Sequence, residues 1–106
     1  MNSLSSILFT RSADGVLTEA EVTAIEDELL RNPEAGDIIP GTGGVRKIRA
    51  AISGRGKRGG ARVLYHYVSH MATVFLIAVY AKNQASTLSE SGKRVIKKLT
   101  AILDRE

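Results

Sequence analysis

Three segments between Val45 and Lys82 alternate apolar and polar residues with a period of two, and this pattern constrains the fold more than any other feature. Successive side chains of a strand point to opposite sides of a sheet, so the alternation is typical of strands with one buried face. The segments are residues 45–52, 62–69 and 73–82, and we expect the last, which is the most apolar, to be central. Because short connections join them, the sequence predicts a small antiparallel sheet.

The same alternation predicts which side chains share a face of that sheet. In the second segment Arg62 and His66 point to one side, and Tyr65 is expected in the core on the other. In the third segment the two expected sets are Phe75, Ile77 and Val79 on one side, and Leu76, Ala78, Tyr80 and Lys82 on the other. The cations expected on a common open face are Lys47, Arg49, Arg62 and Lys82. They meet there only if each strand keeps this register, since a slip of one residue inverts a face.

Two helices are predicted, one before and one after these segments. Thr18 and Glu21 form a capping-box pattern at the start of the first helix, and Asn32-Pro33 ends it. The second helix begins at the N-cap Ser89. Its expected buried residues are Val95, Ile96, Leu99, Ile102 and Leu103, with Lys93, Lys97 and Lys98 facing outward.

A short, partly apolar segment, Leu4 to Arg11, is expected to form the first strand. The element order is then β-α-β-β-β-α within a single domain, residues 1–106, whose length is enough for one modest core. The predicted fold class is α+β: a small antiparallel sheet with the helices packed on one face and the basic side chains on the other.

Two glycine-rich segments are expected to form loops. Residues 37–44 contain three glycines, but neither Gly-Lys-Ser/Thr nor a helix start follows, which argues against a nucleotide-binding loop. Residues 53–61 are predicted to form a flexible hairpin connection, and its cations are expected to contact an RNA backbone without taking part in chemistry. Those cations are Arg55, Lys57 and Arg58.

Charge is segregated along the chain. Residues 38–89 carry eight Lys and Arg and no Asp or Glu, so all 11 acids lie in the two flanks. Like charges held close together repel, and a basic stretch without acids for pairing is typical of a surface that binds a polyanion. We therefore expect nucleic acid or phosphate as a partner, with a merely solvated basic face as the alternative.

Composition excludes several kinds of site. Without cysteine the chain has no disulfide, thiolate–metal site or Cys nucleophile, and two histidines without a nearby carboxylate do not make a zinc site. No metal or other cofactor is expected. The first residues lack the features of a signal peptide, and no apolar run is long enough for a membrane span. The sequence therefore predicts a cytoplasmic protein without a membrane partner.

The basic half has no carboxylate that could act as a general base. An enzyme with such a face would use His, Lys, Tyr or Arg, which suits phosphodiester cleavage by a ribose 2′-OH because the substrate brings its own nucleophile. A lysine can be the base where neighbouring cations disfavour its protonated form. Lys47 is the first choice, and Lys82 or His66 would protonate the leaving 5′-oxygen.

Two basic, glycine-containing blocks resemble a known family. They are residues 32–49, with the run Pro-Gly-Thr-Gly-Gly-Val-Arg-Lys, and residues 54–65, Gly-Arg-Gly-Lys-Arg-Gly-Gly-Ala-Arg-Val-Leu-Tyr. With the strand that ends Tyr80-Ala-Lys-Asn83 and the Leu88-Ser89 pair before a basic helix, the chain resembles the RelE/HigB-type toxins of bacterial toxin–antitoxin pairs. This resemblance implies a fold of the microbial-ribonuclease type. It also implies cleavage of mRNA in the ribosomal A site, which inhibits translation.

The resemblance further implies site residues and partners. The residues that match the family's catalytic positions are Lys47, Arg49, Arg62 and Lys82, and His66 is a candidate on the same face. The residues expected to contact RNA are Arg46, Arg55, Lys57, Arg58 and Tyr80. Some relatives stack a tyrosine from the last helix on a base; residues 84–94 contain no aromatic, so Tyr80 or His66 is the expected substitute. The implied partners are the ribosome, mRNA and a cognate antitoxin, expected to be a helix-turn-helix protein of the HigA type.

Two other classes of function stay open. One is a non-catalytic RNA- or ribosome-binding inhibitor of translation, and the other is a ParE-like inhibitor of DNA gyrase. Relatives of the ParE type share the fold but generally lack the cationic catalytic set. The predicted grouping of cations on one face therefore favours the nuclease.

Overall fold

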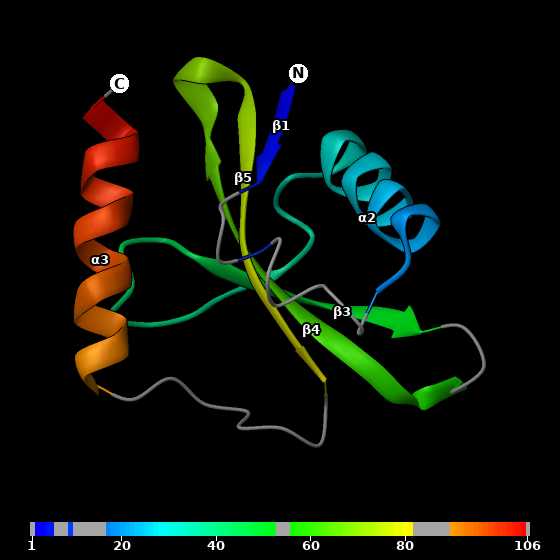
Figure 1. Ribbon diagram of the computed structural model, residues 1–106. Coiled ribbons are helices and arrows are strands. Elements are labelled where there is room, and N and C mark those ends of the chain that lie inside the picture. The colour runs from blue at the N-terminus through cyan, green and yellow to red at the C-terminus, as the bar shows by residue number, and fades with distance from the viewer. Residues whose placement is uncertain (1, 6–8, 10–16, 53–55, 82–89, 106) are drawn as a thin grey trace.

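The structure, a computed structural model, describes residues 2–5, 9, 17–52, 56–81 and 90–105, and for residues 2–5, 51–52, 56–59 and 81 the backbone alone. Its strands form one sheet in the order β1-β5-β4-β3-β2 (Figure 1). They are β1 (Asn2–Ser5), β2 (Asp37–Ile38), β3 (Arg46–Ile52), β4 (Gly56–Val68) and β5 (Thr73–Ala81). The helices are α2 (Glu19–Arg31) and α3 (Glu90–Arg105), and a 3-10 turn (Ser69–Met71) joins β4 to β5.

The α+β class and the antiparallel pairing of the later strands are confirmed. Strands β2, β3, β4 and β5 pair antiparallel, while β1 adds to β5 in parallel. The first strand ends at Ser5, and Phe9, which the sequence prediction placed in it, is helical and buried. Strand β2 is an addition to the expected order, because Asp37 and Ile38 pair with β3 instead of belonging to a loop.

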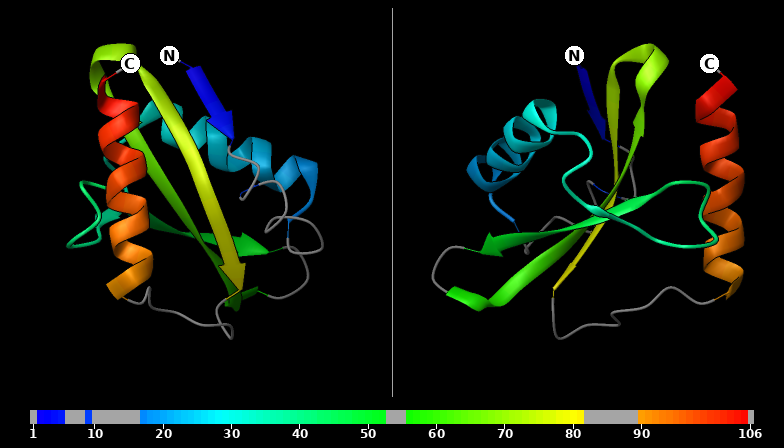
Figure 2. Two further views of the ribbon diagram at one scale, coloured as in Figure 1. Left: turned by 60° about the vertical axis from the view of Figure 1, so that its left-hand side comes forward. Right: turned by 180° about the vertical axis from the view of Figure 1, so that it is seen from behind.

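The two helices cover opposite faces of the sheet, so the prediction that both pack on one face was wrong (Figures 1 and 2). Ile25 and Leu29 of α2 lie in the main core with Tyr65 of β4. Ile96 of α3 packs against a second cluster on the other side, which contains Leu64. The reason is that the face of the sheet that carries the cations is also partly apolar, and those residues require a cover of their own. They are Val45, Leu64 and Ile77.

Two strands depart from their predicted extents or faces. Strand β4 begins at Gly56, where Gly56 pairs with Ile52, so most of the expected hairpin connection is strand. In β5 the register skips Ile77, because Leu64 pairs with Ala78 and Tyr65 pairs with Leu76. Such a bulge shifts the alternation of the strand by one residue. Residues before and after it therefore do not keep to the two faces that strict alternation predicts. Leu76 and Val79 consequently share the main core, and Ile77 joins Ala78 and Tyr80 on the α3 side.

The start of α2 follows the sequence closely. Thr18 Oγ1 accepts a hydrogen bond from the Glu21 amide at 3.1 Å, and Glu21 Oε1 accepts one from the Thr18 amide at 2.8 Å. This is the reciprocal capping box, which satisfies two amides that the helix itself leaves unpaired. At the other end Asn32 caps the helix. Within the described part of the chain, no helix is both long and apolar enough to cross a bilayer.

Tyr65 ties the segment after α2 to the sheet. Its buried hydroxyl donates to the Pro33 carbonyl and accepts from the Gly36 amide, each at 2.8 Å. Gly36 is required there, because a Cβ would lie 2.7 Å from the Lys47 carbonyl oxygen and 2.9 Å from the tyrosine ring. Burial of the hydroxyl raises the pKa of Tyr65, and the hydrogen bond from Gly36 partly opposes this rise.

We expect Tyr65→Phe to lower the free energy of unfolding by about 1–3 kcal/mol, since it leaves a buried amide and carbonyl unpaired. The measurement is urea unfolding, with Tyr67→Phe as the matched control. Tyr67 is half-buried, and its hydroxyl has no hydrogen-bond partner among the described residues. Equal losses in the two variants would contradict a special role for Tyr65.

The difference between wild type and Tyr65→Phe should also depend on pH. A raised pKa in the folded state means that the fold favours the neutral hydroxyl. This contribution is complete below the ordinary value of 10.0 and is lost as pH rises through the raised pKa. The stability advantage of wild type over Tyr65→Phe should therefore shrink above pH ~10.

Candidate functional site

A row of side chains crosses three strands on the face that α3 covers. Arg49 of β3 pairs directly with Arg62 of β4, and Arg62 pairs with Tyr80 of β5. Lys47 lies two positions before Arg49 and therefore points to the same side. We call Lys47, Arg49 and Arg62 the cationic row, and Tyr80 lies beside it. The structure brings these residues together as the alternation predicted, and Lys47 and Arg49 are exposed.

The two arginines of the cationic row have no carboxylate partner in the described part of the chain, where the ion pairs are His66–Asp104 and Lys93–Glu90. Directly opposite residues have Cβ atoms about 4.5–5.5 Å apart, and like charges at that spacing destabilise a sheet. Arg62 Nη1 is also buried and lacks a hydrogen-bond partner among the described residues. Guanidinium groups can each donate two hydrogen bonds to a phosphate, so an anion bound between them would relieve both costs.

His66 lies on the same side of β4 as Arg62, but it is buried under α3 instead of open to solvent. Its side chain Nε2 is 2.8 Å from Oδ1 of Asp104, and the residue is only 5% exposed. The other ring nitrogen, Nδ1, has no partner among the described residues. No local pattern in the sequence indicates the Asp104 contact, because 38 positions separate the pair. No group of three His, Asp or Glu side chains within the described residues could hold a metal ion.

The glycine-rich segment before β3 anchors α3 (Figure 2). Thr100 is buried in α3, and its hydroxyl donates to the Thr42 carbonyl at 3.0 Å. Thr42 Oγ1 in turn donates to the Ile39 carbonyl and accepts from the Val45 amide, which closes the loop. Gly43 has φ +78°, and a Cβ there would overlap Thr100 Oγ1, so the glycine lets the helix approach. This segment was predicted to be a loop, and its packing against Thr100 was not predicted.

Of the other predicted site residues, the structure describes the side chains of Arg46 and His66 but not those of Arg55, Lys57, Arg58 or Lys82. Arg46 points to the α2 side, where its Nη1 donates to the carbonyls of Gly36 at 2.7 Å and Glu34 at 3.3 Å. Its RNA contact stays a prediction, and in this structure it fixes the segment that precedes β2. Lys57 and Arg58 belong to β4, of which the structure describes only the backbone at those positions. Arg55 and Lys82 lie outside the described residues.

Comparison with solved structures defines the class of fold. The crystal structure of the isolated E. coli RelE toxin is similar with a TM-score of 0.53 and 18% sequence identity, over 92% of this chain and 96% of that chain. At this identity the likeness shows the fold alone. The family model described as the RelE toxin of the RelE / RelB toxin–antitoxin system matches residues 9–105. The chain therefore belongs to the RelE toxin family, which implies a cognate antitoxin as its partner.

We expect Asp104→Ala to lower the free energy of unfolding by about 1–3 kcal/mol, because it leaves the buried His66 Nε2 without its partner. Urea unfolding measures the loss, and amide hydrogen exchange should show faster exchange in α3. Asp27→Ala, an exposed change on α2, is the control. Asp104→Asn retains an acceptor and should keep most of the stability. A loss no larger than that of Asp27→Ala would show that the pair does not hold the helix.

Proposed function

We propose that this protein is the toxin of a toxin–antitoxin pair and acts as a ribosome-dependent endoribonuclease that cleaves mRNA in the A site and so inhibits translation. The observation that carries the proposal is the directly opposed pair Arg49–Arg62, which no described carboxylate neutralises. A phosphodiester is an anion with the geometry that two guanidinium groups bind. Membership of the RelE toxin family supports the same reading.

The proposed reaction uses the substrate's own nucleophile and no metal ion. The ribose 2′-oxygen forms a bond to phosphorus as it loses its proton, and the bond between phosphorus and the 5′-oxygen breaks. The products are a 2′,3′-cyclic phosphate and a 5′-hydroxyl. Cations placed around the phosphate stabilise the charge that develops in the transition state, which is commonly the largest catalytic contribution.

Each member of the cationic row, and Tyr80 beside it, has a role in this proposal. Arg49 and Arg62 hold the phosphate, Lys47 accepts the 2′-OH proton, and Tyr80 stacks on a base. Because His66 is buried and bonded to Asp104, we favour Lys82 as the proton donor to the 5′-oxygen. Arg55, Lys57 and Arg58 would bind the RNA backbone on either side of the reacting phosphate.

Two alternatives make different predictions. A non-catalytic inhibitor would arrest translation without new mRNA ends, and a ParE-like inhibitor would act on DNA gyrase and leave mRNA intact. The cationic row favours cleavage over both. The proposal places the protein in the cytoplasm with the ribosome, and its antitoxin is proposed to be of the helix-turn-helix, HigA-like type. Induced expression followed by mapping of mRNA 5′ ends distinguishes the three.

We expect Arg62→Ala to lower the rate of mRNA cleavage on ribosomes by a factor on the order of 10² or more, because a transition-state contact is lost. Single-turnover cleavage and circular dichroism measure the rate and the fold. Arg31→Ala, an exposed arginine at the end of α2, is the matched control and should cleave normally. Cleavage by Arg62→Ala within a few-fold of wild type would remove Arg62 from the proposed site.

The role of Lys47 can be separated from its charge by Lys47→Arg. The substitution keeps a cation but replaces a possible proton acceptor with a group that stays protonated. We expect the variant to bind ribosomes as wild type does and to cleave far more slowly. Rapid cleavage by Lys47→Arg would mean that Lys47 supplies charge alone. The base would then have to be sought at His66 or in ribosomal RNA.

A further inference from the structure

An apolar stripe on the outer side of α3 is left open to solvent. Val95 is 67% exposed and Ile102 is 54% exposed, although the sequence prediction placed both in the core. They are seven positions apart, about two helical turns, and so lie on the same side of the helix. Leu99, half-buried, lies between them. We call Val95, Leu99 and Ile102 the α3 stripe.

The stripe exists because the apolar side of α3 is wider than the part that covers the sheet. Contact with the rest of the molecule is centred on Ile96, Thr100 and Asp104, which face the second cluster, Thr42 and His66. Val95 and Ile102 are displaced around the helix from that line. Aliphatic side chains that stay exposed forgo the stabilisation that burial of their apolar surface would give. The pattern of residues at i, i+4 and i+7 is that of a helix face which binds another apolar face.

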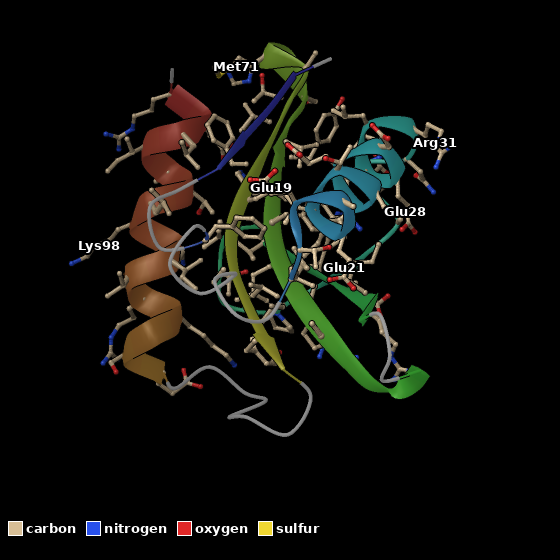
Figure 3. All side chains as sticks on the ribbon, turned by 45° about the vertical axis from the view of Figure 1, so that its right-hand side comes forward. Glu19, Glu21, Glu28, Arg31, Met71 and Lys98 are labelled. Carbon is tan, nitrogen blue, oxygen red and sulfur yellow. The ribbon has the colours of Figure 1, made fainter. Side chains whose placement is uncertain are left out.

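Other cations, on α3 itself, border the α3 stripe on its solvent side. Arg94, Lys98 and Arg105 are exposed, and Lys98 projects away from the body of the molecule (Figure 3). The described acids of the helix are both engaged elsewhere, Glu90 with Lys93 and Asp104 with His66. The surface thus combines an apolar strip with an unneutralised positive edge. Its complement is a helix with an apolar face and acidic residues along one side.

We propose that the α3 stripe and its cations are a docking surface for an acidic amphipathic helix of the cognate antitoxin. This inference rests on the proposed function as a toxin of a toxin–antitoxin pair. RNA is a weaker fit, because a phosphate backbone would engage the cations and leave Val95 and Ile102 exposed. The helix stays on the sheet in this arrangement, held by Thr100 and Asp104. Because α3 lies over the sheet face that carries the cationic row, an antitoxin bound along α3 would lie on the same side of the sheet as that row.

The test uses the full-length toxin and its co-purified cognate antitoxin, with two variants and one control. Val95→Ser/Ile102→Ser removes the apolar stripe, and Arg94→Glu/Lys98→Glu reverses the charge beside it. Ile38→Ser is the matched control, because Ile38 is similarly exposed, at 55%, on the edge strand β2. Calorimetry should show at least about 10-fold weaker antitoxin binding for each double variant, from lost burial or reversed charge, and no change for Ile38→Ser.

Two further readouts distinguish this inference from the proposed function. Translation arrest by the free Val95→Ser/Ile102→Ser toxin should equal that of wild type, and the α3 amides should be more protected from hydrogen exchange in the complex. Unchanged antitoxin binding by both folded variants would overturn the inference, as would loss of α3 protection in the complex or an effect confined to ribosome binding. Absence of translation arrest by wild type would instead overturn the proposed function, whatever the binding results.

Discussion

Strand β4 is the constraint on which the rest of the structure depends. It is hydrogen-bonded to β3 on one side and to β5 on the other, so its register fixes the position of both neighbours. Its residues Ala61, Val63 and Tyr65 build the core beneath α2, and Arg62 and Leu64 face α3. A period of two thus lets one strand serve the core and the candidate site at once. A slip of one residue would bury the arginine and expose the tyrosine together.

The two faces of the sheet are closed by different forces. The α2 side is closed by a continuous apolar core, whereas α3 buries few apolar residues and is fixed by hydrogen bonds from Thr100 and His66. A large apolar interface on that side would have to replace the cationic row. Polar anchors avoid this conflict, because each is specific in position and its loss leaves a buried group unpaired. The Gly43 backbone conformation is part of the same solution, since it admits the Thr100 hydroxyl.

Local patterns in the sequence predicted what local physics determines. The Thr18–Glu21 capping box and the alternation that places Arg49 and Arg62 on one side depend on neighbours in the chain, and both are found. An amphipathic helix shows that it has a buried side but not which face of a sheet receives it, so α3 was assigned wrongly. The bulge at Ile77 and the His66–Asp104 contact depend on residues distant in sequence, and no periodicity signals either of them.

In the cationic row, the stability of the free protein and the binding of an anion place opposite demands on the charge. Opposed arginines and a buried, unpaired Nη1 both lower the stability of the free protein, and a nearby Asp or Glu would relieve them. Under the proposed function, such a carboxylate would also occupy the position that the substrate phosphate needs and would repel it. An unneutralised site therefore makes the free protein less stable, and binding of an anion raises the free energy of unfolding by RT ln(1 + [L]/Kd). Under the proposed function, this requirement accounts for the absence of acids from residues 38–89.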